Sequence, residues 1–410
     1  MGGPLPVGDP APLDGSLPSS AWQDSDSRSF HAYLHVPFCR VRCGYCDFNT
    51  YTSNELQGFK QSDFASNIAS EIELSARVMQ SEGETLRPLS TVFFGGGTPT
   101  QLPASELCDA LAKLTNTFGI VAGAEVTTEA NPDNVTAEYL ETLVAGGFTR
   151  LSLGMQSAVP EVLRTLDRTH NPANVSNAVA LAKAVGLQVS VDLIYGAPGE
   201  TFEQWQRTVA EALALQTDHI SAYALIVEDG TKMQRDIRAG LLEQPDEDLE
   251  ADKYEFADSE FARAGLEWYE LSNWSSSNST ASAHNLAYWT GMDWWGYGPG
   301  AHSHVGGVRW WNAKHPTTYS AALAQGNSPV VGRETLNTET RLEERILLET
   351  RLRAGLDIDL IRRRSLKAAE IIASLISDEL IDAASAFAGR LVLTTKGRLL
   401  ADAVVRRILP

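Results

Sequence analysis

Cysteine is scarce in this chain, at 4 of 410 residues, which argues against a disulfide-stapled secreted scaffold and for a reducing compartment. Basic residues are also few, because 33 Lys and Arg face 52 Asp and Glu, for a formal net charge of −19. A chain this acidic is a poor general binder of nucleic acid, so we expect no nucleic-acid partner. No apolar run reaches the roughly 18 residues of a membrane span, and the N-terminus has no signal-like segment. We therefore expect a cytoplasmic protein.

The cysteines that are present are concentrated in one place. Cys39, Cys43 and Cys46 fall in a C-x3-C-x2-C pattern directly after an apolar segment, whereas Cys108 fits the apolar stripe of a helix. A closed zinc site wants four ligands, while clustered thiolates hold iron–sulfur clusters. Three thiolates on a four-iron cluster leave one iron open for chemistry. The plainer alternatives are a structural metal or three buried thiols.

The residues around these cysteines resemble the radical S-adenosylmethionine (SAM) superfamily. The similarity lies in the segments Tyr33–Cys39 and Tyr45–Phe48, and it extends from about residue 29 to the C-terminus. Within the superfamily, the chain resembles the family of the anaerobic coproporphyrinogen III oxidases, in its HemW or haem-chaperone branch. The resemblance implies that Cys39, Cys43 and Cys46 hold a 4Fe–4S cluster whose fourth iron chelates SAM, and that one electron splits the sulfonium into methionine and a 5′-deoxyadenosyl radical.

Beyond residue 29, short apolar segments alternate with amphipathic ones. We expect strands at 31–36, 91–94, 125–129, 149–153, 188–194 and 219–225, and helices at 63–79, 105–118, 172–185 and 202–215. This alternation is typical of a parallel sheet with crossover helices. Six such units predict an α/β fold, an incomplete (β/α)6 barrel of the TIM type, in which function collects at the C-terminal ends of the strands.

Polar and glycine-rich motifs follow or end each of these strands. The resemblance implies that the glycine segment contacts the amino group of SAM, that Arg168 pairs with its carboxylate, and that Ala224 lines the adenine pocket. Gln156 suits a sugar hydroxyl, because an amide both donates and accepts. The family resemblance implies the following full set of SAM-binding residues: Tyr33, Tyr45, Gly96, Gly97, Thr98, Glu129, Gln156, Arg168, Asp192 and Ala224.

Each motif taken alone has a plainer explanation. The segment Gly95–Thr100 could form a tight turn, Glu129 could be a cap or a surface acid, and Arg168 could be a solvated charge at a helix end. Asp192 is more informative, because it lies inside an apolar strand, where an unpaired carboxylate would cost several kcal/mol. It therefore needs a partner. Six motifs at six strand ends favour one shared site.

Seven of the nine tryptophans lie between Trp268 and Trp311. The segment His284–Trp289 among them resembles the HNxxYW signature of the haem-chaperone branch. Imidazole is a standard axial ligand of haem iron, and aromatic walls suit a porphyrin face. We name His284 as the candidate haem ligand and His302 and His304 as weaker ones. The alternative is a histidine hydrogen-bonded inside the core.

Two departures separate this chain from the oxidases. The oxidases have a further cysteine two residues after the third cluster cysteine, where this chain has Phe48, and they have a structured N-terminal extension. These departures favour a haem chaperone that delivers haem to acceptor proteins over an oxygen-independent coproporphyrinogen III oxidase. A radical SAM enzyme with an unrelated substrate is a third hypothesis. We assign no catalytic residue, and the sequence leaves open whether SAM is cleaved.

The pattern divides the chain into four parts. Residues 1–28 are rich in Pro, Gly, Ser and Asp and predict a disordered tail. Residues 29–240 predict the radical SAM barrel, 241–330 an aromatic-rich extension, and 331–410 a winged-helix-like domain with a hairpin at 389–397. Its basic block Arg362–Arg364 fits a solvated helix face first, then a contact with a haem propionate, a membrane surface or a partner, and DNA last. A homodimer, the identity of the acceptor and covalent attachment of haem are left open.

Overall fold

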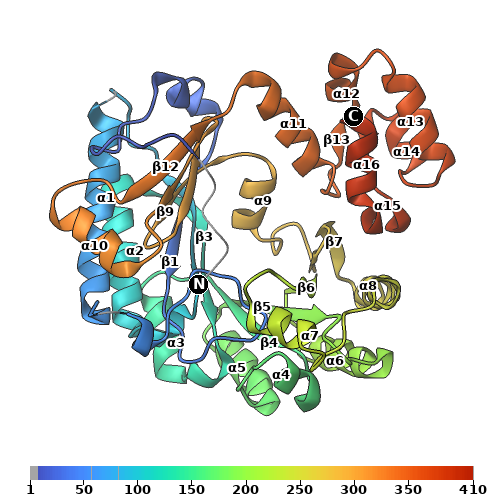
Figure 1. Cartoon of the computed structure of the whole chain (residues 1–410), viewed down its shortest axis with the longest axis horizontal. Coiled ribbons are helices and arrows are strands. Elements are labelled where there is room, and N and C mark those ends of the chain that lie inside the picture. The colour runs from blue at the N-terminus through green and yellow to red at the C-terminus, as the bar shows by residue number, and fades with distance from the viewer. Residues whose placement is uncertain (1–7, 57, 82, 410) are drawn as a thin grey trace.

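The computed structural model describes residues 8–56, 58–81 and 83–409. These residues form a central twelve-stranded sheet in the order β12-β11-β10-β9-β1-β2-β3-β4-β5-β6-β8-β7. Its middle consists of six parallel strands, which are β1 (Phe30–Val36), β2 (Leu89–Gly96), β3 (Ile120–Ala130), β4 (Arg150–Gln156), β5 (Gln188–Tyr195) and β6 (His219–Ala224). All six predicted strands are confirmed, with β3 starting five residues earlier. The sheet curves into an open barrel (Figure 1).

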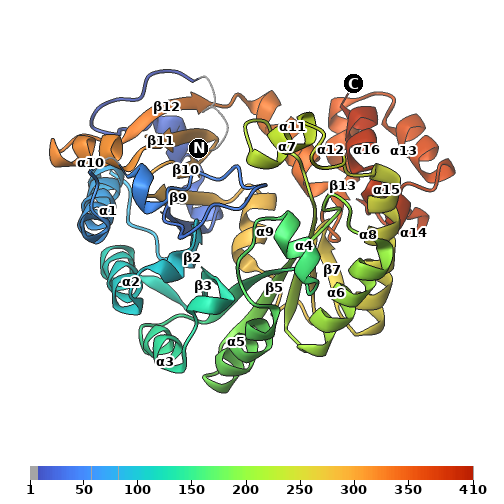
Figure 2. The same ribbon diagram turned by 60° about the horizontal axis from the view of Figure 1, so that its bottom comes forward.

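Helices cover the outer face of the parallel strands (Figure 2). They are α1 (Phe64–Ser81), α2 (Ala104–Phe118), α3 (Ala137–Ala145), α5 (Pro172–Ala184) and α6 (Phe202–Ala214), whereas the short α4 (Pro160–Thr165) packs in a separate apolar cluster with Ile194, Leu225 and Met233. The four predicted helices are among them. The start of α6 follows from its sequence, because Thr201 and Gln204 form a capping box that satisfies free backbone N–H groups. Outward-facing strand residues such as Leu34 and Phe94 are fully buried beneath this layer.

The N-terminal segment is ordered from residue 8, so the prediction of a disordered tail is wrong for residues 8–28. Asp9 pairs with Arg333 through the backbone, and Ser19–Trp22 forms a short 3-10 helix whose Ala21 and Trp22 side chains are buried. The sequence pattern missed this segment because it packs through isolated apolar residues without helical or strand periodicity. Residues 1–7 of the predicted tail lie outside the described residues.

The aromatic-rich part extends both edges of the barrel. After α7 (Lys232–Arg238) and α8 (Glu247–Arg263), strands β7 (Glu267–Glu270) and β8 (Asn273–Ser275) add to β6. At the other edge, β9 (Asp293–Tyr297) runs parallel to β1 and continues into an antiparallel set, which is β10 (His302–Val305), β11 (Val308–Asn312) and β12 (Val330–Thr335). Between the two edges, α9 (Ala283–Trp289) contacts β2. Strand β12 spans the predicted boundary at 330/331, so this sheet ends at Thr335.

The last part of the chain packs around its own apolar core, which includes Ile346, Leu375 and Val404. Its elements are α11 (Thr338–Glu349), β13 (Leu356–Asp357), α12 (Ile358–Arg364), α13 (Ala368–Ser377), α14 (Ala383–Phe387), β14 (Arg390–Leu391), α15 (Thr395–Leu399) and α16 (Ala401–Ile408). Helix α10 (Pro316–Ala324) lies before it, on the barrel.

The predicted hairpin at 389–397 is wrong. Strand β14 pairs with β13, and Leu393 forms a bridge with Ile381, so both partners of this segment come from earlier in the chain. Residues from Thr395 onward are helical because the Thr394 side chain accepts a hydrogen bond from the Gly397 N–H and caps α15.

The basic block is partly neutralised by its own surroundings. Arg362 pairs with Asp359, and Arg364 pairs with Glu339 and Glu343. These exposed pairs agree with the hypothesis of a solvated helix face. Among the described residues, no helix combines the length and the apolar character that crossing a membrane requires.

Candidate functional site

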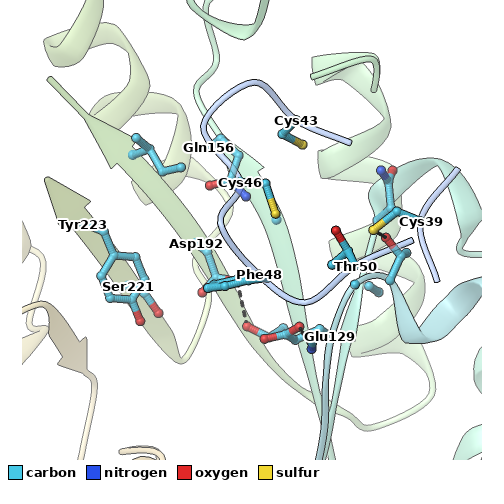
Figure 3. A pocket seen from close by; sticks show the side chains of 18 of the residues that line it. Cys39, Cys43, Cys46, Phe48, Thr50, Glu129, Gln156, Asp192, Ser221 and Tyr223 are labelled. Carbon is cyan, nitrogen blue, oxygen red and sulfur yellow. Dashed lines mark hydrogen bonds between the residues drawn. The ribbon is translucent and has the colours of Figure 1, made fainter. Parts of the chain in front are cut away.

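The C-terminal ends of the parallel strands open into a cavity of about 670 Å³, within the usual range of ligand pockets. All six parallel strands contribute to its lining, together with the loop after β1 that carries the cysteines (Figure 3). The structure thus brings together every predicted cluster and SAM residue, namely Cys39, Cys43, Cys46, Tyr33, Tyr45, Gly96, Gly97, Thr98, Glu129, Gln156, Arg168, Asp192 and Ala224. The predicted residues therefore line one cavity at the C-terminal ends of the strands, as expected for a barrel of this type.

The three cysteines lie along one loop, from Cys39 to Cys46, held by backbone bonds such as Cys39 N–H to the Tyr51 carbonyl at 3.1 Å. The glycine segment after β2 packs directly against this loop. A Cβ on Gly97 would lie 2.6 Å from the Phe38 carbonyl oxygen and 3.0 Å from Cys39 Sγ, so a larger residue would push the loop away. The segment Gly95–Thr100 is therefore more than a tight turn, because its Gly97 packs against the cysteine loop.

These side chains fit an iron–sulfur cluster. The Cys39 thiol has its pKa raised to about 11 by burial, and burial also raises the pKa of Cys46, so both need a cation to become thiolates near neutral pH. Among the described residues, no three His, Cys, Asp or Glu side chains stand close enough for one metal ion. Cys108 lies elsewhere, on α2, where its thiol points at the Thr142 carbonyl.

Arg168 is the cation beside the cysteines. Its Nη1 lies 3.5 Å from Cys43 Sγ, its Nη2 donates to the Gly154 carbonyl at 2.9 Å, and its buried Nε has no partner. A solvated charge at a helix end would show none of these contacts. An unsatisfied buried donor is costly, so this guanidinium is poised for an anionic group that enters the cavity.

Gln156 owes its position to an irregularity at the end of β4. Its backbone has φ +61°, in the left-handed region that non-glycine residues rarely adopt, and the pairing with β5 shifts register between Gly154 and Gln156. The bulge re-aims the side chain into the cavity. Backbone strain of this kind costs about 1–2 kcal/mol and collects at functional sites.

Two half-buried carboxylates face the cavity from neighbouring parts of the sheet (Figure 3). Glu129 accepts a hydrogen bond from the Gly96 N–H at 3.1 Å, and burial together with nearby Asp192 raises its pKa to about 8. Burial also raises the pKa of Asp192, which accepts a hydrogen bond from the Ser152 hydroxyl at 3.0 Å and so has one partner of the kind that its place in an apolar strand requires. Glu129 is therefore neither a cap nor a surface acid. A cation in the cavity would favour ionisation of both groups.

Sequence reasoning missed Arg150, which lines the deeper part of the same cavity. This residue is buried at the start of β4, its Nη1 donates to the Thr280 carbonyl at 2.8 Å, and its Nη2 has no partner. The signal was available, because Arg150 is a charged residue bordering an apolar strand, just as Asp192 is. Ser152 and Ser221, which also line the cavity, carried no such signal because serine is common in loops and strands alike.

His284, the predicted haem ligand, is hydrogen-bonded inside the core. Its Nδ1 lies 2.6 Å from the Thr91 hydroxyl, its Nε2 lies 2.9 Å from the Tyr288 hydroxyl, and its ring stacks on Phe93 at 5.2 Å. Burial lowers its pKa well below the usual value. His284 lines the cavity, but neither ring nitrogen is free for an iron. The geometry matches the alternative of a core histidine and speaks against His284 as an axial ligand.

The two weaker haem candidates differ from each other. His304 is buried between β9 and β11, where its Nδ1 donates to the Met292 carbonyl at 3.0 Å and its Nε2 accepts from the Gly307 N–H at 3.2 Å. His302 has an exposed ring that stacks on Trp311. Of the three predicted candidates, His302 alone presents its imidazole to solvent.

Comparison with known proteins agrees with this geometry. Residues 33–212 match the model of the radical SAM superfamily. The chain is 45% identical over 381 residues to a protein of Mycobacterium tuberculosis named heme chaperone HemW, covering 93% of this chain and 95% of that one. It is 33% identical to the heme chaperone HemW of Bacillus subtilis, over 79% and 84% of the two chains.

A solved structure has the same fold. The chain superimposes on the coproporphyrinogen III oxidase HemN of Escherichia coli, a radical SAM enzyme, with a TM-score of 0.78, over 93% of this chain and 90% of that one. The two are 23% identical, so the match establishes the architecture alone.

Proposed function

The chain belongs to the radical SAM superfamily and, within it, to the HemW family, and from this premise we propose that it is a haem chaperone, which binds haem and transfers it to acceptor proteins. The observation that carries the proposal is the extent of the similarity to the heme chaperones, which runs through the barrel, the extension and most of the C-terminal part. The similarity covers 95% of the Mycobacterium tuberculosis protein and 84% of the Bacillus subtilis protein, so it is not confined to the barrel.

The cofactors that the family implies are a 4Fe–4S cluster and SAM. We propose that Cys39, Cys43 and Cys46 hold three irons of the cluster, with SAM on the fourth. When bound, this pair of cofactors supplies one-electron cleavage of the sulfonium. Support comes from the thiols on one loop, at the mouth of a cavity deep enough for a nucleoside.

The chain's own residues would orient SAM by charge. The Arg168 guanidinium, with its unpartnered Nε, suits the carboxylate, because a planar fork matches two carboxylate oxygens. Glu129 and Asp192 suit the cationic and hydroxyl-bearing parts, since a bound cation would oppose the burial that raises the pKa of both carboxylates. Gly96, Gly97 and Ala224 offer backbone where a side chain would block approach.

The second candidate is an oxygen-independent coproporphyrinogen III oxidase, favoured by the shared fold with HemN. Phe48 stands against it. This residue occupies the position where the oxidases carry a further cysteine, and its ring is 60% exposed at the rim of the cavity. An exposed phenyl ring can pack on a flat apolar ligand, but it cannot take part in the thiol chemistry of that position.

The remaining predictions extend this proposal. We propose that the barrel, the extension up to Thr335 and the winged-helix-like part act as three units. Support for the last comes from β13, β14 and the Ile381–Leu393 bridge, which form a small antiparallel wing beside α12 and α13. A cytoplasmic location rests on the reduced cysteines, and a homodimer and a contact with a membrane surface stay predictions.

A side-by-side assay tests the function. Anaerobically reconstituted protein is titrated with haem while the Soret band is followed, and the same preparation is incubated with coproporphyrinogen III, SAM and a reductant. We expect saturable haem binding, transfer to an apo-haemoprotein, and no decarboxylated product. Product formation at enzyme-like turnover, or an absence of haem binding in the intact holo-protein, would contradict the proposal.

A further inference from the structure

Exposed apolar side chains gather at the mouth of the cavity. Thirteen large apolar side chains are exposed among the described residues. Four of these thirteen line the cavity, with exposed fractions from 44% to 67%, and they are Val41, Phe48, Tyr223 and Ile226. Exposed apolar residues that are scattered singly need no explanation, whereas a cluster of them around an opening marks a place where an apolar ligand binds. None of the four belongs to the predicted SAM residues.

These four side chains come from two segments that are joined to each other. The first two lie on the cysteine loop, and the other two lie at the end of β6 and directly after it. The Met233 N–H, from the chain that follows β6, donates to the Gly44 carbonyl of the cysteine loop at 2.9 Å. Tyr45 of the same loop packs against the apolar cluster that contains Leu225. The four side chains therefore belong to one rim, held together beneath its exposed surface.

Two of the rim residues are aromatic. In Figure 3, the Phe48 ring points into the cavity from the cysteine loop, and the Tyr223 ring points into it from β6. No aromatic ring stacks on either of them among the described residues. Aromatic rings pack favourably on other planar apolar groups. The faces of both rings are therefore available to a planar ligand that enters the mouth of the cavity.

The charges around the mouth are unevenly placed. Arg40 of the cysteine loop is exposed and lines the cavity, and no ion pair engages it among the residues that the structure describes. The carboxylate of Asp47 on the same loop has a cation near it, namely Lys314. On the other segment, the exposed Glu228 also lines the cavity. An apolar ligand with carboxylates at one edge would therefore turn that edge toward Arg40 and away from Glu228.

We propose that the rim formed by Val41, Phe48, Tyr223 and Ile226 binds the macrocycle of haem at the mouth of the cavity, with a propionate on Arg40. This inference rests on the proposed function, which makes haem the ligand. Haem matches the rim because it is planar, apolar over most of its area and carries its two carboxylates at one edge. The rim contacts the macrocycle and not the iron, so a metal-free porphyrin should bind to it as well.

The test titrates the anaerobically reconstituted full chain with haem and, separately, with metal-free protoporphyrin IX. We expect Phe48→Ser to weaken the binding of both at least tenfold, because the rim loses its exposed phenyl ring. Phe48→Tyr should bind both as the wild type does, since a ring of the same shape remains. Phe387→Ser is the matched control, because it removes an exposed ring on α14, in the last part of the chain, and it should bind both as the wild type does.

The contact with a propionate is tested by charge. We expect Arg40→Gln to weaken haem binding about threefold at low salt and to reduce its dependence on KCl, because salt screens a contact between exposed charges. Arg363→Gln removes an exposed arginine of the basic block and should change neither value. A loss in Arg363→Gln but not in Arg40→Gln would place the propionate on the basic block and would overturn the assignment to the rim.

Phe48 is exposed, so its variants should keep the unfolding temperature, iron content and SAM affinity of the wild type, and these are measured first. Unchanged haem affinity in Phe48→Ser, with normal binding by the wild type, would overturn the inference and leave the proposed function standing. An equal loss in Phe387→Ser, or a loss of SAM affinity as large as the loss of haem affinity, would overturn it as well. A wild type that binds no haem would contradict the proposed function itself.

Discussion

Polar side chains in the cavity of the barrel have fewer hydrogen-bond partners than those in the sheet extension beside it. In the cavity, Glu129 has one hydrogen bond and a pKa raised to about 8, and the Arg168 Nε has no partner. In the extension, Glu71 of α1 accepts from three donors that belong to Tyr319, Gly298 and Asn312. Glu71 is buried and nearly complete without a ligand, whereas Glu129 and Arg168 are half-buried in the cavity and have fewer partners.

The difference separates structural polar groups from binding groups. A buried group that is left short of partners lowers the stability of the empty protein by about 1–3 kcal/mol, and such a loss is tolerated where a ligand restores the missing interactions. Glu71 ties α1 to the strands around Gly298, and its three hydrogen bonds oppose the effect of burial, which still raises its pKa to about 7. Glu129 and Arg168 have fewer partners and are free to bind a ligand. Each prediction below tests this distinction between polar groups that stabilise the fold and polar groups that bind a ligand.

The largest effect is expected from the cysteines. A triple Cys39→Ala, Cys43→Ala, Cys46→Ala variant should reconstitute with no cluster, because all the proposed ligands are gone. Iron content and the broad visible absorbance of the anaerobically reconstituted protein measure this. Cys108→Ala is the matched control, and it should keep both values, since Cys108 lies on α2 away from the cavity. Full iron content in the triple variant would refute the cluster assignment.

The second effect concerns Arg168. We expect Arg168→Met to weaken SAM binding about 10- to 100-fold, since a hydrogen bond to a charged group contributes about 1.5–3 kcal/mol. Equilibrium dialysis of SAM against samples with equal iron content measures this. Arg164→Met removes a neighbouring arginine that is exposed and pairs with Glu161, and it should leave the affinity unchanged. Equal SAM affinities in the two variants would mean that Arg168 serves the fold alone.

Much of this site was predictable because two local rules point to it. A charged or glycine-rich motif at the end of an apolar strand is visible in the sequence, and parallel strands place all their C-terminal ends at one edge. Glu129, Asp192 and Gln156 follow from these rules together with the family resemblance. The left-handed backbone of Gln156 does not, because nothing in the sequence marks a bulge at a non-glycine residue.

What the sequence could not give are the contacts between distant segments. The resemblance to the HNxxYW signature predicts His284 as a haem ligand, but its hydrogen-bond partner Thr91 lies 193 residues away, so the sequence does not reveal that its ring nitrogens are already engaged. Asn49 reaches Lys314 over 265 residues. The segment 8–28 was misjudged for a similar reason, since Trp22 is buried against parts of the chain that follow it. Local composition records none of these pairings.

The third effect is a pH dependence that Glu129 imparts to the stability of the cluster-free protein. Its raised pKa means that the folded protein keeps a proton between about pH 4.5 and about pH 8 that the unfolded chain has lost. The free energy of unfolding therefore falls as the pH rises across this window, and levels off above it. Glu129→Gln should flatten that fall, whereas Glu138→Gln, an exposed control on α3, should not.

Urea denaturation at pH 5, 6.5 and 8 measures this slope. One pKa unit corresponds to about 1.4 kcal/mol, so the change should be on the order of a few kcal/mol at pH 8 and close to zero at pH 5. A parallel slope in the wild type and in Glu129→Gln would mean that Glu129 is ionised at neutral pH in the empty cavity. The contrast with the saturated carboxylate of Glu71 would then disappear.

The smallest effect on cofactor binding is expected at Arg398, whose partners lie on α8 and β7 and not in the cavity. It binds both oxygens of Asp258, at 2.8 and 2.5 Å, donates to the Tyr254 hydroxyl at 3.1 Å and stacks over the Trp268 ring at 4.6 Å. These contacts join the last part of the chain to α8 and β7. Arg398→Met should lower the free energy of unfolding by about 2–4 kcal/mol, because it leaves Asp258 without its cation.

Iron content and SAM affinity should not change in Arg398→Met, because this guanidinium lies in a paired network and not in the cavity. Arg407→Met is the control, since its exposed pair with Asp378 should contribute about 0–1 kcal/mol. Urea denaturation and SAM dialysis on the same samples measure both properties. The Nη1 and Nη2 atoms of Arg398 are paired and its buried Nε is not, so this arginine is saturated only at its two terminal nitrogens. A loss of SAM affinity without a loss of stability would show that pairing of the terminal nitrogens does not distinguish structural from binding groups in this fold.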